Sequence, residues 1–307
     1  MNRVIAVADI GGTNARFATA ELDGSKVLSV SEPATLQTSH VSTFGEAWEA
    51  FVGRLGGKAP DSLGLAFAGP VDGPNVKLTN NDWKIDRDEL RALGIEKFRI
   101  VNDFGAVAYA IGALGDEHFM PLCGPAGPMP SGGVVTVVGP GTGLGVAQIV
   151  FGEIVESEGG HAGFAPADDV EDQLVRDVRR RSGRVEIEHL TSGPGLSNIH
   201  RMLTGEEVDD SILWAEVLDG GESEAFDRWC AILGGFAGDL ALIQGADAVV
   251  VAGGLGYRLR DRLAKSRFEE RFVAKGQFQK RMRAIPVRIL DHPQPGLLGA
   301  AVAFARG

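Results

Sequence analysis

The stretch VVGPGTGLG, residues 137–145, places a glycine at every second position between two apolar runs, 134–138 and 146–150. Two strands joined by a glycine-rich turn predict a hairpin. Glycine takes up positive φ and lets backbone N–H groups approach an anion closely, so the turn is also a candidate phosphate-binding loop. No Gly-Lys-Ser/Thr sequence follows, and the next segment reads as a strand, which excludes a Walker loop and the dinucleotide fingerprint. Taken alone, such a stretch is a tight hairpin about twice as often as a ligand site.

A second glycine hairpin is predicted at the start of the chain. The apolar run 3–8 ends at Asp9, and a Gly-Gly-Thr-Asn turn then leads into another strand within DIGGTNARFATAEL, residues 9–22. The rest of this half alternates strand and helix: a strand over 27–30, a helix over 43–57, a strand over 62–71, and a strand ending at 101 that leads into a helix.

The second half repeats this order after its own hairpin. We expect a long helix over 222–244, a strand and glycine-rich turn over 247–256, a helical stretch over 257–275, a last strand over 285–290 and a terminal helix over 296–306. The Pro- and Gly-rich segment 121–133 is the predicted junction between the halves. Two halves built alike predict two glycine hairpins that face each other across a cleft and hold a polyphosphate chain between them.

Composition limits the classes of partner. The 307 residues are 44% hydrophobic and 23% charged, as expected for a soluble globular protein of one large or two ordinary domains. The formal net charge of −11 argues against nucleic acid or an anionic membrane as a partner, because no basic surplus is present. A nucleotide site in such a chain needs a metal ion and backbone dipoles. The two isolated cysteines, Cys123 and Cys230, indicate neither a disulfide framework nor a metal cluster, and a cytoplasmic protein is expected.

These motifs resemble the bacterial glucokinase family, within the sugar kinase, Hsp70 and actin ATPase superfamily. DIGGTNARFA (9–18) is similar to the first phosphate motif, GPGTGLG (139–145) to the second and VVVAGGLG (249–256) to the adenosine motif. VNDFGAVAYA (101–110) resembles the segment that carries the catalytic Asp. The remaining matches are to sugar-contacting segments and a further family motif: ESEGGHAGFAP (156–166), EHLTSGPGLSNIHR (188–201) and LTNNDW (78–83).

The resemblance implies a fold and an activity. The fold is α/β, a duplicated actin-like ATPase (ribonuclease H-like) fold with two lobes around a central cleft. The small lobe is expected over 1–110 plus 296–307 and the large lobe over 111–295. The activity is ATP-dependent phosphorylation of glucose at the 6-hydroxyl, giving glucose 6-phosphate and ADP. ATP and Mg²⁺ are the implied cofactors, and a homodimer is the implied assembly.

Asp103 is the implied catalytic residue and Asn102 a sugar ligand. Asp103 would accept the proton of the sugar 6-hydroxyl as that oxygen attacks the γ-phosphorus. Because phosphoryl transfer has a loose transition state, its positioning of the hydroxyl can matter more than its basicity. The structural alternative is that Asp103 is a helix N-cap or first-turn residue.

The other implied sugar ligands are Glu158, His161 and Glu188. Carboxylate acceptors and an imidazole suit sugar hydroxyls, which donate and accept hydrogen bonds. Glu186 can replace Glu188 after a small register shift. The alternatives are that Glu158 and His161 are ordinary surface loop residues, or that His161 binds a metal.

The implied ATP ligands lie in the three glycine motifs. Those for the phosphates are Asp9, Gly11, Gly12, Thr13, Asn14, Gly141, Thr142 and Gly143. Gly253 and Gly254 would leave flat space for adenine, unless they form an ordinary turn at a strand end. Asp9 would hold Mg²⁺ through water, or would only cap its turn. Arg16 is a possible counter-charge whose direction depends on the hairpin register.

Rival functions come from neighbouring classes. The related sugar kinase and repressor family carries a Cys-rich zinc motif, which two isolated cysteines cannot supply. An actin-like or Hsp70-like ATPase would release phosphate without sugar. A non-catalytic sugar sensor would bind hexose without turnover.

Overall fold

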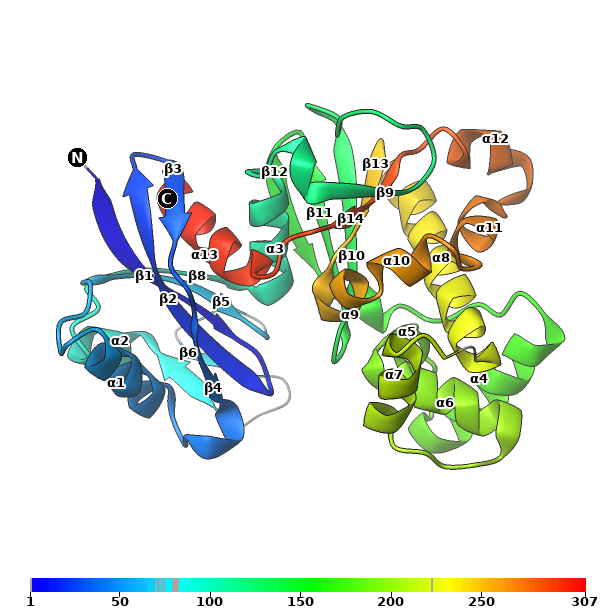
Figure 1. Ribbon diagram of the computed structural model, residues 1–307, viewed down its shortest axis with the longest axis horizontal. Coiled ribbons are helices and arrows are strands. Elements are labelled where there is room, and N and C mark those ends of the chain that lie inside the picture. The colour runs from blue at the N-terminus through cyan, green and yellow to red at the C-terminus, as the bar shows by residue number, and fades with distance from the viewer. Residues whose placement is uncertain (1, 70, 72, 74, 79–82, 222) are drawn as a thin grey trace. The chain divides into compact units, whose positions relative to one another are not determined.

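The computed structural model describes residues 2–69, 71, 73, 75–78, 83–221 and 223–307 (Figure 1). It divides into two compact units: unit 1 is Met1–Leu114 with Pro293–Gly307, and unit 2 is Gly115–His292. The expected lobes, 1–110 with 296–307 and 111–295, have boundaries a few residues from those of the units. The junction predicted over 121–133 is wrong, because Phe119–Cys123 forms a strand (β9) inside the sheet of unit 2.

The sheet of unit 1 has the order β3-β2-β1-β5-β8, with β4 also paired to β2. The strands are β1 (Arg3–Ile10), β2 (Asn14–Asp23), β3 (Lys26–Val30), β4 (Ala34–Gln37), β5 (Ser62–Phe67) and β8 (Lys97–Asn102). β1 pairs antiparallel with β2 across the predicted hairpin and parallel with β5, which in turn pairs parallel with β8. The carboxyl ends of three strands therefore meet at one edge.

Helices cover both faces of this sheet. The elements are η1 (Thr38–His40), α1 (Phe44–Arg54), α2 (Arg87–Ala92), α3 (Asp103–Ile111), α13 (Pro295–Arg306) and the small hairpin β6 (Asn75–Lys77) with β7 (Lys84–Asp86). Alternate residues of β1 face opposite ways: Ala6 and Ala8 pack in the cluster of α1, whereas Ile5 and Val7 pack against α13.

Small residues let α13 lie directly on its neighbours. A Cβ atom at Gly299 would lie 1.7 Å from the carbonyl oxygen of Ala106 in α3. A Cβ atom at Gly64 of β5 would lie 2.4 Å from the carbonyl oxygen of Ala300. Both values are far inside van der Waals contact, so only glycine permits this close packing of α13 against α3 and the sheet.

The sheet of unit 2 repeats the order of unit 1. Its order is β12-β11-β10-β13-β14-β9. The strands are β9 (Phe119–Cys123), β10 (Val134–Pro140), β11 (Leu144–Val150), β12 (Glu153–Ser157), β13 (Ala248–Val251) and β14 (Val287–Leu290). As in unit 1, an antiparallel run of three strands is followed by two parallel strands. The prediction of two halves built alike is confirmed.

The helices of unit 2 differ in part from expectation. They are η2 (Asp116–His118), η3 (Gly159–His161), α4 (Asp169–Ser182), α5 (Glu188–Thr191), α6 (Gly193–Thr204), α7 (Asp210–Leu218), α8 (Glu224–Gln244), α9 (Gly253–Arg258), α10 (Arg260–Leu263), α11 (Phe268–Val273), η4 (Gly276–Phe278) and α12 (Gln279–Met282). The turn expected after β13 is the start of α9. The helical stretch expected over 257–275 is divided among α9, α10 and α11, and the Ser266 hydroxyl accepts the N–H of Phe268 at the start of α11.

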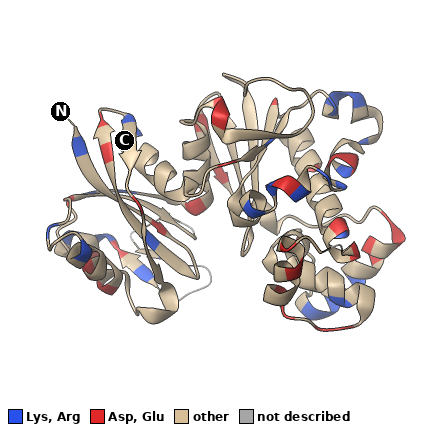
Figure 2. Ribbon diagram, viewed as in Figure 1, with Lys and Arg blue, Asp and Glu red and all other residues tan. Residues whose placement is uncertain are grey.

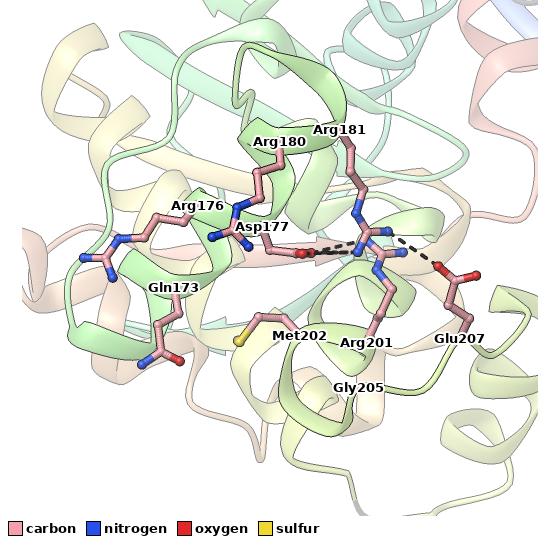
Figure 3. Close-up of a pocket in the computed structure, with 9 residues that line it drawn as sticks. All are labelled: Gln173, Arg176, Asp177, Arg180, Arg181, Arg201, Met202, Gly205 and Glu207. Carbon is pink, nitrogen blue, oxygen red and sulfur yellow. Dashed lines mark hydrogen bonds and ion pairs between the residues drawn. The ribbon is translucent and has the colours of Figure 1, made fainter.

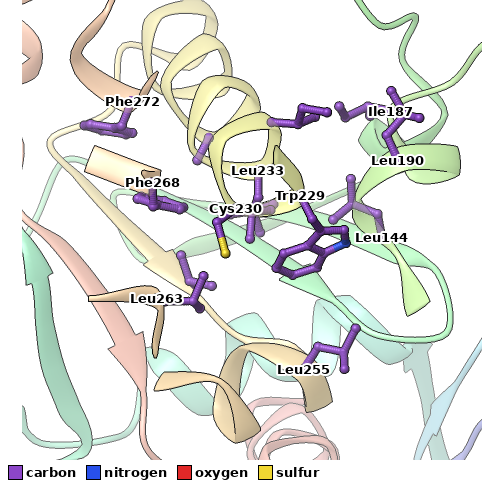
Figure 4. Packing of buried hydrophobic residues seen from close by; sticks show 14 of the residues in the cluster. Leu144, Ile187, Leu190, Trp229, Cys230, Leu233, Leu255, Leu263, Phe268 and Phe272 are labelled. Carbon is purple, nitrogen blue, oxygen red and sulfur yellow. The ribbon is translucent and has the colours of Figure 1, made fainter. Parts of the chain in front are cut away.

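The core of unit 2 forms around α8. Trp229, Cys230 and Leu233 pack in one buried cluster with Phe268 and Phe272 of α11 (Figure 4). The Trp229 indole N–H donates to the carbonyl oxygen of Ser192 at 3.2 Å, which ties α8 to the start of α6. Among helices of the described residues, none has the length and apolar character needed to span a bilayer.

Candidate functional site

The first group of candidate residues lies at the carboxyl edge of the unit 1 sheet. The strand register places Ile10 opposite Phe67 and Phe67 opposite Asn102, in one row across β1, β5 and β8. With strands spaced about 4.8 Å apart, Asp9 on β1 and Asn102 on β8 are about 10 Å from each other in this direction. Ligands of α/β proteins bind at such an edge.

The first glycine turn is hydrogen-bonded to the short helix η1. The N–H of Gly11 donates to the carbonyl oxygen of Asn14 at 2.9 Å and closes the turn. The hydroxyl of Thr38 donates to the carbonyl oxygen of Gly12 at 2.6 Å. The backbone N–H of Thr38 donates to the carbonyl oxygen of Thr13 at 3.0 Å. Three carbonyl groups of the turn are therefore bonded to the protein, and the Thr13 side chain is exposed.

Asp9 and Arg16 face each other across this hairpin. They are paired in the register of β1 and β2, with Nη1 of Arg16 3.4 Å from Oδ2 of Asp9. Burial raises the pKa of the Asp9 carboxyl, and Arg16 offsets part of that rise. The start of α13 also closes over Asp9, because a Cβ atom at Gly296 would lie 2.7 Å from its Cγ. The register thus directs Arg16 toward Asp9.

Asn102 and Asp103 begin α3. Asn102 is the N-cap, and its Oδ1 accepts the N–H groups of Phe104 at 2.9 Å and Gly105 at 3.1 Å. Asp103 is the first helical residue, and its Oδ1 accepts the Phe104 N–H at 2.8 Å. The capping role considered for Asp103 therefore belongs to Asn102.

The second glycine turn belongs to unit 2. The N–H of Gly141 donates to the carbonyl oxygen of Gly143 at 2.8 Å, and the N–H of Gly193 at the start of α6 donates to that of Gly141 at 2.7 Å. The expectation of positive φ is wrong here, because Gly139, Gly141, Gly143 and Gly145 are not in the left-handed region. Their absence of side chains supplies room instead: a Cβ atom at Gly141 would meet no described atom within 4 Å.

The adenosine motif lies beside this turn. Gly253 has φ +79°, and a Cβ atom there would lie 2.6 Å from the carbonyl oxygen of Pro140. Glycine is thus required twice at this position, for its backbone conformation and for the close approach of α9 to β10. A Cβ atom at Gly254 would meet nothing within 4 Å, so the surface beside the first turn of α9 is open.

His161 lies between two carboxylates. Its Nδ1 is 2.7 Å from Oε2 of Glu186, and its Nε2 is 3.9 Å from Oε2 of Glu158. The hydrogen bond with Glu186 is the main cause that raises the pKa of His161 and lowers the pKa of Glu186. Arg184 supports the pair, since its Nε lies 3.3 Å from the other oxygen of Glu186. Glu186, considered only as a substitute for Glu188, is the direct partner of His161.

Glu188 supports the second glycine turn. Its Oε2 accepts the buried N–H of Leu144 at 2.8 Å. A Cβ atom at Gly143 would lie 2.6 Å from the same oxygen. The short helix α5 therefore carries a carboxylate that links the predicted sugar-binding segment to the predicted phosphate-binding turn. Sequence reasoning did not find this contact, because its partners are 44 residues apart.

The described residues do not form a metal site made of protein side chains alone. No group of three or more His, Cys, Asp or Glu side chains among them could hold one. The described part of the chain therefore lends no support to a metal site at His161. Asp9 fits Mg²⁺ only as a single carboxylate that acts with water and phosphate oxygens, the mode that Mg²⁺ commonly uses.

The motif LTNNDW lies largely outside the described residues, which exclude 79–82. Its two ends are described. The N–H of Leu78 donates to the carbonyl oxygen of Trp83 at 3.1 Å, and the buried indole N–H of Trp83 donates to that of Val41 at 3.1 Å.

Comparison with known proteins shows one consistent similarity. A family model described as Glucokinase matches residues 6–307. The chain is 45% identical to a glucokinase of Zymomonas mobilis subsp. mobilis, with 98% of this chain and 97% of that protein covered. It is 39% identical to a glucokinase of Caulobacter vibrioides, with 97% and 94% covered.

Comparison with solved structures also finds glucokinases. A glucokinase from an Antarctic psychrotroph is 30% identical, covers 99% of both chains and has a TM-score of 0.82. A glucokinase from Balamuthia mandrillaris in complex with glucose, 21% identical, covers 100% of this chain and 94% of its own with a TM-score of 0.80. A ROK family glucokinase from Streptomyces griseus in complex with glucose and AMPPNP is 20% identical and has a TM-score of 0.67. The match covers 97% of this chain and 98% of that chain. The last two show the fold alone. The predicted duplicated actin-like ATPase fold is confirmed.

Proposed function

The chain belongs to the glucokinase family, and we propose that it transfers the γ-phosphoryl group of ATP to the 6-hydroxyl of glucose, with Asp103 as the general base. The observation that carries the residue assignment is the position of Asp103 at the start of α3, at the sheet edge that also carries the first glycine turn. The proposed base and the proposed phosphate-binding turn thus share an edge of the kind at which α/β proteins bind ligands.

Asp103 takes the proton of the 6-hydroxyl as the oxygen attacks the γ-phosphorus. The Phe104 N–H bond orients the carboxylate through Oδ1. Because the transition state is loose, alignment of the hydroxyl supplies most of the acceleration and proton transfer the remainder. Asn102, fixed by its two capping bonds, adds an amide group beside the sugar.

The sugar ring is held by the group around His161. Glu186 orients the imidazole ring of His161 through Nδ1. The raised pKa of His161 favours the imidazolium, whose Nε2–H is a donor to a sugar hydroxyl. The Glu158 carboxylate lies 3.9 Å from Nε2, beyond a good hydrogen bond, and is available as an acceptor. Glu188 offers its second oxygen to the sugar while the first supports Leu144.

The phosphates are bound by the two glycine turns. Backbone N–H groups of Gly12 and Gly143, with the Thr13, Asn14 and Thr142 side chains, are the proposed donors. Gly11 and Gly141, whose N–H groups close the two turns, carry no side chain and leave room for the phosphates. Mg²⁺, when bound, neutralises phosphate charge, and Asp9 would hold it through water. Arg16 supplies local positive charge in a chain of net charge −11. Gly253 and Gly254 line the adenosine position, where Gly254 leaves open space.

A coupled ADP-release assay tests the function. Purified protein with ATP and Mg²⁺ should release ADP with glucose and form glucose 6-phosphate; mannose, fructose, galactose and N-acetylated hexosamines then define specificity. Brisk ADP release without sugar would favour an actin-like or Hsp70-like ATPase, and hexose binding without turnover a sensor. The proposal includes a cytoplasmic homodimer, which sedimentation and cell fractionation would test.

A further inference from the structure

A basic cavity lies between α4 and α6 in unit 2 (Figure 3). Its volume is about 650 Å³, within the range typical of small-molecule sites. Four arginines line it: Arg176, Arg180 and Arg181 from α4 and Arg201 from α6. We call it the arginine cavity.

The charge of the arginine cavity is opposite to that of the chain. Four guanidinium groups face two lining carboxylates, Asp177 and Glu207, in a protein of net charge −11. Acidic residues occupy the first turn of α4 and arginines its last turn (Figure 2). A local excess of positive charge in an acidic chain favours a small anion over nucleic acid, because the rest of the surface would repel a polyanion.

The carboxylates do not neutralise all four arginines. Arg181 donates to both oxygens of Asp177 at 3.2 and 3.0 Å, and Arg201 lies 3.5 Å from the same carboxylate. Figure 3 shows Arg181 and Arg201 reaching toward each other from opposite walls. The side chains of Arg176 and Arg180 make no hydrogen bond or ion pair with any residue in the described part of the chain. Two guanidinium groups thus remain available to a ligand.

Buried donors add a second, independent observation. Nε of Arg201 and Oγ of Ser197 are buried and find no hydrogen-bond partner among the described residues. A smaller hollow of about 320 Å³ is lined by the same two residues together with Glu207, Val208 and Asp209. Buried polar atoms without partners are rare in folded proteins, and a bound anion would supply an acceptor for both of these groups.

We propose that the arginine cavity binds a small molecule with two or more phosphate groups. Arg176 and Arg180 take one phosphate through their planar N–H forks, and Arg201 with Ser197 takes another. The site is separate from the second glycine turn: α6 meets that turn at Gly193, and Arg201 lies eight residues further on, about 12 Å along the helix. The proposal is therefore independent of glucose phosphorylation.

Isothermal titration calorimetry without ATP or glucose tests the proposal. The probes are fructose 1,6-bisphosphate and inorganic tripolyphosphate, which separate a phosphate ester from a free phosphate chain. The test variant is Arg176→Gln with Arg180→Gln, which removes two exposed side chains that bond to no described residue. The matched control is Arg179→Gln with Arg283→Gln, which removes the same charge from exposed positions outside the cavity.

We expect at least one probe to bind the unaltered protein and the test variant to bind it about tenfold or more weakly, since bonds to charged groups are lost. The control variant should bind within about twofold of the unaltered protein, since exposed charges outside the cavity are screened. Absence of binding by both probes, or equal weakening in the two variants, would overturn the proposal. Unchanged binding in the test variant would also overturn it, because the probe would then occupy another site, such as the glycine turns.

Discussion

Oε2 of Glu188 accepts a hydrogen bond from the backbone N–H of Leu144 at 2.8 Å, so a proposed sugar ligand also supports the second glycine turn. Glu188→Gln keeps an oxygen for this bond but loses the charge offered to the sugar. We expect the KM for glucose to rise about tenfold with little change in the KM for ATP. Steady-state kinetics with each substrate varied in turn measures both.

Glu188→Ala is the informative comparison. It leaves the buried Leu144 N–H without a partner, which costs about 1–3 kcal/mol of stability. The KM for ATP should then rise with the KM for glucose, and the melting temperature should fall. If Gln and Ala variants behave alike for both substrates, the link between the two motifs plays no part in ATP binding.

Asp103→Asn tests the general base. The amide keeps an oxygen for the Phe104 N–H but cannot take the 6-hydroxyl proton, so turnover should fall about 10²- to 10⁴-fold. Glucose affinity should be mostly retained, because Asn102, Glu158 and Glu188 still hold the ring. Asp88→Asn is the matched control, since Asp88 is also in the first turn of a helix, α2. Near-normal turnover in Asp103→Asn would leave Asp103 a structural first-turn residue.

The sequence predicted the strands and hairpins well but not the contacts among the site residues. Apolar runs, alternating apolar residues and glycine turns are local signals, and they located β1, β2, β10 and β11. The start of α9 at Gly253 was missed because glycine is a poor helix former; the close approach to Pro140, which requires glycine at this position, is a tertiary contact. Glu186 meets His161 across 25 residues, a distance over which only tertiary packing decides the partner.

We expect Asp9 to contribute to catalysis by holding Mg²⁺ and not through its ion pair with Arg16. Asp9→Asn is expected to raise the Mg²⁺ concentration for half-maximal rate about 10- to 100-fold, the range for a group that acts through a bound water. Arg16→Gln should instead raise the KM for ATP at saturating Mg²⁺. Asp23→Asn, at the exposed end of the same hairpin, is the control. An identical Mg²⁺ dependence in the Asp9→Asn variant and the unaltered protein would contradict the role of Asp9.

The pair of His161 and Glu186 should give a pH-dependent contribution to stability. The pKa of His161 is raised above its usual 6.5, so its contribution is complete below pH 6.5 and is lost as the pH rises through the raised value. The pKa of Glu186 is lowered from 4.5, so its contribution is present above pH 4.5 and is lost as the pH falls through the lowered value. The pair is therefore most stabilising between these two limits.

Two measurements check this window. In an NMR titration, the His161 ring should titrate above its usual range and return toward it in Glu186→Gln, while His40, distant in sequence and not paired with Glu186, stays unchanged. The difference in unfolding free energy between the unaltered protein and His161→Gln should shrink as the pH rises above 6.5. A difference that grows with rising pH would have the wrong sign.

Gly141→Ala separates ligand binding from structure. A Cβ atom at Gly141 would meet no described atom within 4 Å, and its φ is not in the left-handed region, so the fold should tolerate alanine. If the second turn holds phosphate, the new methyl group stands where the ligand approaches, and the KM for ATP should rise about tenfold or more, the cost of a lost charged hydrogen bond. Thermal unfolding should change little, because no packed atom is displaced.

Gly132→Ala is the matched control. A Cβ atom there also meets nothing within 4 Å, and this glycine precedes the same hairpin at the opposite end of β10. Both variants should melt close to the unaltered protein, but only Gly141→Ala should lose ATP affinity. An unchanged KM for ATP in Gly141→Ala, with normal stability, would mean that VVGPGTGLG is a structural turn and that the ATP phosphates bind elsewhere.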